Sequence, residues 1–212
     1  NVCIDSDDFM SDNAIELIYK LWKNTNITPD IAGIVALDAD KNNKVIGSKI
    51  PENLKKTTLE DLYNVHKAYG DKKLVLRTEI VNKFERYPIY KEERFVPLDT
   101  LYLMIDKTYK LLCLNEVLCI VEYMEDGSSR NIFKQYLRHP RGFLYARTMA
   151  MRKSNFLKVK LKNTIHFISH CIHLKDWNTL FFKSPKPFMT FLMIPLGIAL
   201  YIFIKIKVKF KF

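Results

Sequence analysis

Acidic side chains are nearly missing from the last part of this 212-residue chain. From Phe133 to the C-terminus Asp176 is the only Asp or Glu, whereas lysine and arginine are frequent there. The first half is close to charge balance, so the formal net charge of +11 is concentrated at one end. Such an excess calls for an anionic partner, either a nucleic acid or a membrane face. Because the basic stretch adjoins an apolar tail, the sequence favours a membrane surface and no nucleic acid.

Cysteines are few and irregularly spaced, and the sequence contains no internal repeats. The four thiols, at Cys3, Cys113, Cys119 and Cys171, lie in apolar or helical contexts. This pattern excludes a disulfide framework and indicates buried free thiols in a reducing compartment. A hydrophobic content of 48% with 27% charged residues is typical of a globular protein that can bury a core.

The first 131 residues alternate between strand and helix patterns, which predicts an α/β fold. A polar turn, "EDGSS", is expected at 125–129. The expected elements are a buried strand at 2–4, an amphipathic helix at 13–23, a buried strand at 30–37, a helix at 58–70 ended by Gly70, a strand at 72–81, a helix entered near Pro97, and a buried strand pair at 111–124.

Two further segments follow this α/β region. Residues 132–182 read as a basic helical extension, and 183–212 as an apolar segment with a Lys-rich tail. Phe188–Ile204 is seventeen residues long and uncharged, close to the lower limit of about 17 residues for a membrane-spanning helix. The sequence therefore predicts a membrane-associated C-terminal helix. An interfacial helix and a buried soluble helix remain as alternatives.

Three carboxylates, Asp5, Asp7 and Asp8, crowd the end of the first apolar run. Clustered acids beside a buried strand are costly unless a cation joins them. One carboxylate would be enough to cap the helix expected after Ser11, so three exceed that need. Hard divalent ions such as Mg²⁺ or Mn²⁺ prefer carboxylate oxygens and commonly bind diphosphates. A simple capping turn is the alternative interpretation.

The stretch "CIDSDDFMSDNAIELIYKL" resembles the aspartate motif of family 2 glycosyltransferases, in particular the bacterial enzymes that build capsular or other surface polysaccharides. The similarity continues through "GDKKLVLRTEIV", "YKEERFVPLDTLYLMIDKTYKLLCLNEVLCIVEYMEDGSSRNI" and "QYLRHPRGF", over roughly residues 1–150. It implies a Rossmann-like fold of the GT-A type. Family members carry further strands before the motif, so the resemblance also implies the C-terminal part of a longer enzyme.

The resemblance implies inverting transfer of a sugar from a nucleotide-sugar donor, in the first place a UDP-sugar, to a hydroxyl of a glycan or lipid-linked acceptor. Asp5, Asp7 and Asp8 would hold Mn²⁺ or Mg²⁺ on the donor diphosphate. The catalytic base of the family matches "FVPLDTLY", where Leu98 replaces the first expected acid and Asp99 is the second. Asp99 is therefore the expected base, with Glu92 and Glu93 as fallbacks.

Arg138 and Arg141 form a basic patch that could contact the donor diphosphate or a lipid-linked acceptor. A solvated or membrane-facing helix surface explains them equally well. "QYLRH" lacks the Trp of the Q-x-x-R-W sequence found in processive relatives, which implies addition of a single sugar. With the basic helices and the apolar tail, the resemblance implies a location on the cytoplasmic face of a bacterial cell membrane.

Other interpretations remain open. His166, His170 and His173 have helical spacing and could hold zinc, although an interfacial helix face is the simpler explanation. A truncated, inactive, membrane-associated interaction module is the main alternative function. A phosphatase of the haloacid dehalogenase type is a weaker one, because Asp8 follows Asp7 directly and Val75 stands where a second acid is needed.

Overall fold

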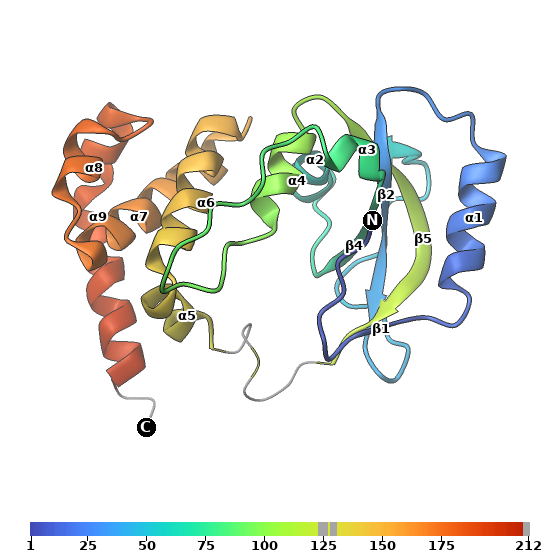
Figure 1. Cartoon of the computed structure of the whole chain (residues 1–212), viewed down its shortest axis with the longest axis horizontal. Helices are drawn as coiled ribbons and strands as arrows, with labels where there is room; N and C mark the ends of the chain where they lie inside the picture. Colours follow the sequence, from blue (N-terminus) through green and yellow to red (C-terminus); the bar gives the residue numbers. More distant parts are fainter. Residues whose placement is uncertain (123–126, 128–130, 210–212) are drawn as a thin grey trace. The chain divides into compact units, whose positions relative to one another are not determined.

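The computed structural model describes residues 1–122, 127 and 131–209 (Figure 1). The expected turn at 125–129 and the last residues of the tail therefore lie outside the described residues, apart from Gly127. The chain forms two compact units, Asn1–Glu85 with Met104–Met124, and Arg86–Leu103 with Glu125–Phe212. The mixed α/β composition is confirmed, whereas the GT-A architecture stays a prediction. The segments 132–182 and 183–212 lie in one unit together with Arg86–Leu103.

The first unit is built on a sheet with the strand order β1-β5-β2-β4. The parallel pair β2–β5 forms its centre, and β1 and β4 are antiparallel to their neighbours. All nine residues of β2 are buried, because strands flank it on both sides. The strands are β1 (Phe9–Met10), β2 (Ile31–Ala39), β4 (Lys72–Leu76), β5 (Lys110–Ile120) and the short β3 (Lys56–Thr57), which pairs with β5.

Two strand predictions fail in detail. The expected buried strand at 2–4 is wrong: Val2 makes a single bridge to Val75, and Val2 and Cys3 are exposed. This segment runs along the outer edge of β4, where Asn1 and Leu76 exchange hydrogen bonds, so its side chains meet solvent. Residues 111–120 of the expected strand pair belong to the single long strand β5, and residues 123–124 lie outside the described residues.

Helices frame this sheet. Helix α1 (Ala14–Asn24) packs Leu17, Ile18 and Leu21 against the sheet core, as expected from its amphipathic pattern. Helix α2 (Leu59–Asn64) begins at Thr58, whose hydroxyl accepts the N–H of Asp61 at 3.0 Å. The predicted strand at 72–81 ends at Leu76, and Thr78–Val81 forms the short helix α3. Helix α4 (Asp99–Ile105) begins two residues after Pro97, and most of it, up to Leu103, belongs to the second unit.

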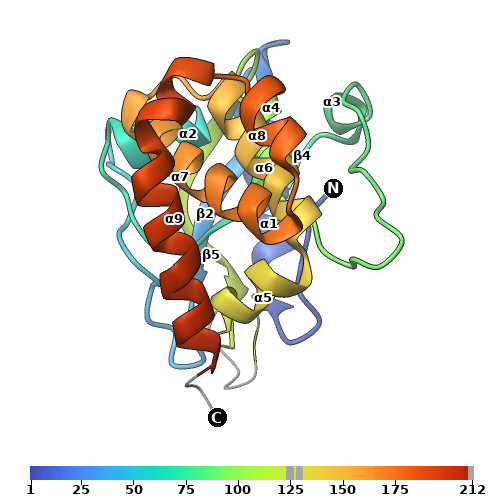
Figure 2. The same cartoon turned by 90° about the vertical axis from the view of Figure 1, so that its left-hand side faces the viewer.

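The described part of the second unit contains five helices, together with Arg86–Leu103, which holds most of α4 and the segment before it. The five helices are α5 (Ile132–Arg138), α6 (Pro140–Lys153), α7 (Leu157–Leu174), α8 (Trp177–Phe182) and α9 (Pro187–Lys209). Helix α7 packs along both α6 and α9, and its Phe167, Ile168 and Cys171 are fully buried (Figure 2). Gly197 of α9 permits the close approach, because a Cβ there would lie 2.4 Å from Ile168 Cγ2.

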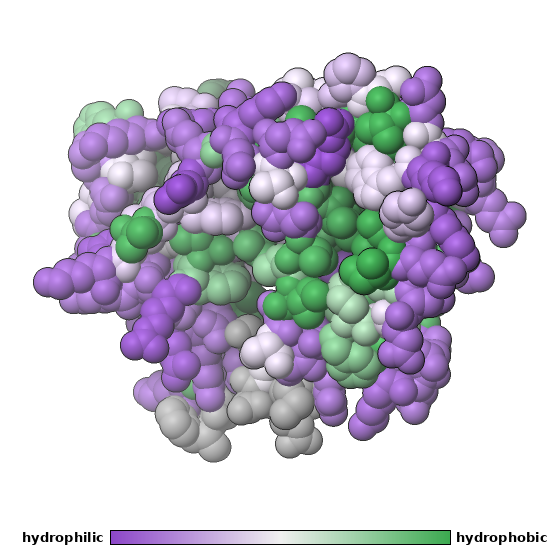
Figure 3. All heavy atoms as spheres, turned by 45° about the vertical axis from the view of Figure 1, so that its right-hand side comes forward, coloured by the Kyte–Doolittle hydropathy of each residue, from purple (hydrophilic) through white to green (hydrophobic). Residues whose placement is uncertain are grey.

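Helix α9 contains the uncharged stretch expected at 188–204. By length and composition it is the one described helix that could cross a membrane, and only 17% of its most apolar window is buried. The exposed apolar side chains of α9 include Phe188, Phe191, Leu192, Leu196, Ile202 and Phe203. On the face drawn in Figure 3, apolar side chains likewise reach the surface among the hydrophilic ones.

Candidate functional site

The aspartate motif forms a tight turn just before β1. The N–H of Asp8 donates to the carbonyl oxygen of Asp5 at 3.0 Å. The side chains of Asp5 and Asp7 are exposed, whereas that of Asp8 is half-buried. Asp8 Oδ1 accepts the backbone N–H of Glu122, just past β5, at 3.3 Å. This bond anchors the turn to the end of β5.

A fourth carboxylate, Asp38, lies near the end of the central strand β2, where it pairs in register with Cys119 of β5. Its side chain is only 3% exposed, and its Oδ1 has no hydrogen-bond partner among the described residues. Burial raises the pKa of Asp38 from 3.8 to about 6, although Lys73 opposes this increase. At neutral pH Asp38 is therefore mostly an ionised and poorly solvated carboxylate.

Lys73 of β4 provides the positive charge next to Asp38. Its side chain is 9% exposed and hydrogen-bonds to the thiol of Cys119. Burial alone would lower the pKa of Lys73, but Asp38, Cys119 and Asp8 together raise it, so the ammonium stays protonated. Burial also raises the pKa of Asp8, while the Glu122 N–H and Lys73 act in the opposite direction. One lysine thus interacts with carboxylates of both the turn and the central strand.

The chemistry of these side chains fits a hard cation. Carboxylate oxygens are the ligands that Mg²⁺ and Mn²⁺ prefer, and the unpartnered Asp38 Oδ1 is a buried acceptor with unused capacity. Within the part of the chain that the structure describes, no three His, Cys, Asp or Glu side chains are grouped to hold a metal ion. Asp5 and Asp7 would have to turn toward Asp8 and Asp38 to complete such a group.

Asp38 was not among the residues expected from the sequence. The stretch "DADKNN" reads as a polar turn, but the turn begins only at Asp40, whose Oδ1 accepts the N–H groups of Asn42 and Lys44. Asp38 itself belongs to the buried strand. An acid that directly follows "IAGIVAL" was the available signal, because ionisable side chains are rarely buried without a partner.

Glu93, a fallback base, caps helix α6 in the second unit. Its Oε1 accepts the N–H of Arg141 at 3.0 Å, and its Oε2 accepts that of Gly142 at 2.8 Å. A carboxylate at this place satisfies two free N–H groups and complements the helix dipole. The contact therefore gives Glu93 a structural role. Glu92, the other fallback, is exposed.

Asp99, the expected base, is the first residue of α4. Solvent reaches its side chain, yet surrounding protein atoms desolvate the carboxyl and raise the pKa of Asp99. Arg147, the backbone N–H of Thr100 and Lys162 oppose this increase. Arg147 is held by Asn163 Oδ1 at 3.1 Å and by the Tyr136 hydroxyl at 3.4 Å. A raised pKa makes a carboxylate a stronger base, and the fixed cation beside it favours the ionised form that accepts a proton.

Arg138 and Arg141 lie on either side of the break between α5 and α6. Arg138 ends α5, and His139 and Pro140 separate it from Arg141 in the first turn of α6. Both arginine side chains are exposed. Arg141 also lines a cavity of about 610 Å³ within this unit.

The three histidines of α7 do not form an interfacial face, so that expectation is wrong. His166 and His170 pack against Tyr136, each at 5.4 Å between ring centroids, and His170 is 1% exposed. Burial, reinforced by Arg147, lowers the pKa of His166 to about 3 and that of His170 far below its usual value. Both are neutral components of the helical core.

Comparison with protein-family models, with curated proteins and with solved structures finds no match for this chain. The resemblance to family 2 glycosyltransferases therefore rests on the sequence motifs quoted above.

Proposed function

We propose that this chain takes part in metal-assisted, inverting transfer of a sugar from a nucleotide-sugar donor to a hydroxyl of a surface polysaccharide or lipid-linked glycan. The observation that supports this function best is the buried Asp38 carboxylate, which shares Lys73 with Asp8 of the aspartate motif. A carboxylate that is poorly satisfied without a ligand is typical of a site that binds a cation.

The roles of the residues follow from their chemistry. Bound Mn²⁺ or Mg²⁺ would neutralise the charge that develops on the departing nucleoside diphosphate. Asp8 and Asp38, completed by Asp5 and Asp7, would hold the ion, and Lys73 would balance the remaining negative charge. Asp99 would accept the proton of the acceptor hydroxyl at its carboxylate. Arg147 and Lys162 favour the ionised form of Asp99 that this step requires.

The unfavourable free energy of an ionised Asp38 in the folded protein supports a functional role for this residue. Because folding raises its pKa, keeping Asp38 ionised at neutral pH destabilises the folded state. Unfavourable charges of this kind are common at binding sites, where stability is sacrificed for function. An Asn at this position would remove the cost, so the aspartate is better explained by a bound cation than by stability.

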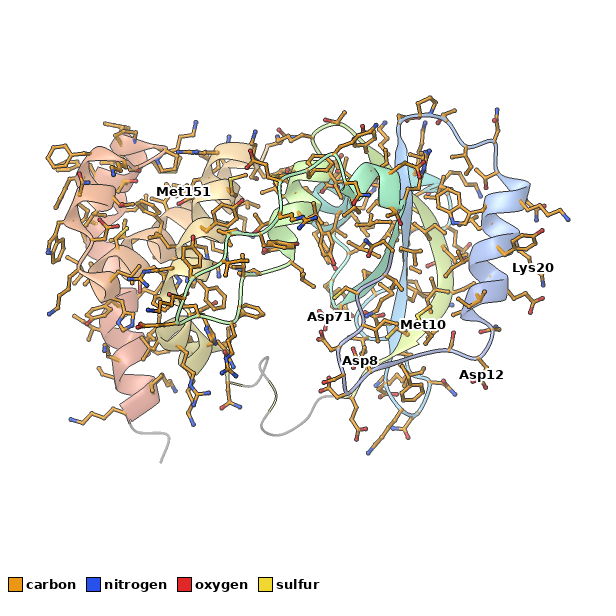
Figure 4. The ribbon with its side chains drawn as sticks, viewed as in Figure 1. Asp8, Met10, Asp12, Lys20, Asp71 and Met151 are labelled. Atoms are coloured by element: carbon orange, nitrogen blue, oxygen red, sulfur yellow. The ribbon has the colours of Figure 1, made fainter. Side chains whose placement is uncertain are left out.

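The decisive experiment is a titration of UDP-sugar binding with Mn²⁺, using the full chain. We expect Asp8→Asn and Asp38→Asn each to weaken the Mn²⁺-dependent part of binding by roughly tenfold or more. Asp12→Asn is the matched control, because Asp12 is an exposed acid that lies in Figure 4 on the side of the sheet where α1 runs, apart from Asp8 and Asp71. Binding that is independent of Mn²⁺, or equally weakened in all three variants, would contradict the proposal.

The second unit supports a location at the membrane. Its basic helices and the exposed apolar side chains of α9 would bring an acceptor held in the cytoplasmic leaflet of a bacterial membrane close to the enzyme.

The same apolar surface also favours a second candidate function, an inactive membrane-associated interaction module. Absence of both UDP-sugar binding and sugar transfer, with vesicle binding retained, would support this module instead. Release of phosphate from a simple monoester would support the phosphatase alternative.

A further inference from the structure

Within the second unit, a cavity of about 610 Å³ opens beside helix α6. Arg141, Tyr145 and Thr148 line it from α6, and Tyr90 lines it from the segment before α4. Lys175, the left-handed residue that ends α7 with φ 56°, completes the cationic part of the lining. Neither the proposed metal ligands nor Asp99 line this cavity.

Its two cations have no carboxylate partner. Arg141 and Lys175 are exposed, and among the described residues neither has a carboxylate oxygen within ion-pair distance. Asp176 also lines the cavity, where its Oδ1 accepts the N–H of Thr179 at the start of α8, whereas Glu93 caps α6 outside the lining. With two cations against one carboxylate, the lining keeps a net positive charge.

Aromatic hydroxyl groups lie beside these cations. Burial raises the pKa of Tyr90, with Glu93 and Tyr145 adding to the increase and Arg141 opposing it. Tyr90 and Tyr145 therefore lie within electrostatic range of each other, and Tyr90 is close to Arg141. The Thr148 hydroxyl donates to the Leu144 carbonyl at 2.8 Å, which leaves its oxygen as a neutral acceptor. The phenolic O–H of Tyr90 and the guanidinium of Arg141 are suitable donors for phosphate oxygens.

We propose that this cavity binds the phosphate group of a phosphorylated ligand, with Arg141 and Lys175 as its charged contacts and Tyr90 as a hydrogen-bond donor. The phosphate could belong to a membrane lipid or to a soluble phosphate ester, because both present the same oxygens. From Phe133 onward the sequence has 16 lysines and arginines against a single acid, so the surrounding field favours either source. The proposal does not depend on the transfer reaction.

The soluble source is tested by titrating inorganic pyrophosphate into the full chain in phosphatidylcholine nanodiscs. EDTA in the buffer prevents any contribution from divalent metal, so failure here leaves the metal proposal untouched. We expect Arg141→Gln/Lys175→Gln to weaken binding by roughly tenfold or more, because two charge-assisted contacts are lost. The matched control is Arg152→Gln/Lys153→Gln, which removes the same charge from exposed residues that do not line the cavity. We expect less than about a twofold change there.

The lipid source is tested by binding of the same proteins to phosphatidylcholine vesicles with and without phosphatidic acid. If vesicle binding depends on phosphatidic acid, and if only the cavity variant loses this dependence while the control variant keeps it, the phosphate belongs to a lipid. Equal losses in the two variants in both arms would overturn the proposal, because bulk charge would then explain binding. Wild-type protein that binds neither probe would overturn it as well. Circular dichroism of each variant confirms that the helices are retained.

Discussion

The carboxylate of Glu93 accepts a hydrogen bond from the backbone N–H of Gly142 at 2.8 Å. Together with the bond to Arg141, this contact ties the segment before α4 to the first turn of α6. The approach is close, because a Cβ on Gly142 would lie 2.1 Å from the carbonyl oxygen of Phe95. Phe95 also packs on Phe143, with 5.4 Å between the ring centroids. The place of Asp99 in its unit depends on this attachment, which lies four to six residues earlier in the chain.

Replacing Glu93 should destabilise the second unit. We expect Glu93→Ala to lower the free energy of unfolding by about 1–2 kcal/mol, because two N–H groups at the start of α6 lose their acceptor. Glu93→Gln should cost less, since it keeps one acceptor oxygen. Urea denaturation followed by circular dichroism measures the effect. Glu92→Ala is the control, and equal losses in Glu92→Ala and Glu93→Ala would contradict the capping role.

A methyl group at Gly142 should be harmful although alanine favours helices. The gain of roughly 1 kcal/mol in helix propensity is smaller than the cost of displacing the Phe95 backbone. We expect Gly142→Ala to lower the free energy of unfolding by about 1–3 kcal/mol. Exposed Arg141→Ala, one residue earlier, should change it by less than about 0.5 kcal/mol. An unchanged or higher stability of Gly142→Ala would show that the two segments are not in close contact.

The buried Asp38 should make stability depend on pH. The pKa of Asp38 is about 6 in the folded protein, against 3.8 for an unperturbed aspartate such as that of the unfolded chain. The folded protein therefore binds the proton of Asp38 more tightly. Protonated Asp38 contributes to the free energy of unfolding below about pH 4. This contribution, about 3 kcal/mol in total, is lost as the pH rises through 6. Asp38→Asn should therefore be more stable than wild type at pH 7 and similar to it at pH 4. Denaturation across this range measures the difference, and parallel profiles would refute it.

If Asp99 is the catalytic base, Arg147 should set the pH at which it works. Arg147→Met removes a charge that favours ionised Asp99, so the pKa of Asp99 should rise further. We expect the acidic limb of the kcat/KM profile for sugar transfer to move to higher pH. Arg152→Met, on the same helix but not among the groups that affect Asp99, should leave the limb in place. An identical profile for both variants would exclude this coupling.

Sequence periodicity was sufficient to predict the elements whose burial depends on a pattern within a single helix or strand. The 3.6-residue pattern of α1 and the apolar run of β2 both correspond to observed elements, because each reflects one face or one strand in the core. The run at 111–124 was ambiguous, since Asn115 and Glu116 interrupt its apolar residues and do not show whether one long strand or two short ones form. The strand expected at 2–4 failed because apolar residues also occupy exposed edges.

The candidate site was less predictable, because its interactions join distant parts of the chain. Asp38 and Lys73 interact through the pairing of β2 and β4, and sequence spacing alone does not reveal that pairing. Glu93 caps a helix that begins 47 residues later in the sequence, whereas capping motifs recognisable in a sequence are local. Asp99, at the head of α4, was placed correctly because the helix start after Pro97 is a local signal.

The contact between Gly197 and Ile168 covers one face of α9, the face that also carries buried Thr190 and Ile204, and most of the helix surface remains open. Lipid could surround α9 on all sides only if α7 first separated from it. Upright insertion of both helices together would draw Lys158, Lys160 and Lys162 of α7 toward hydrocarbon, at a cost of several kcal/mol. With α7 in place, α9 would instead lie parallel to the membrane surface, with its exposed apolar side chains at the depth of the lipid headgroups.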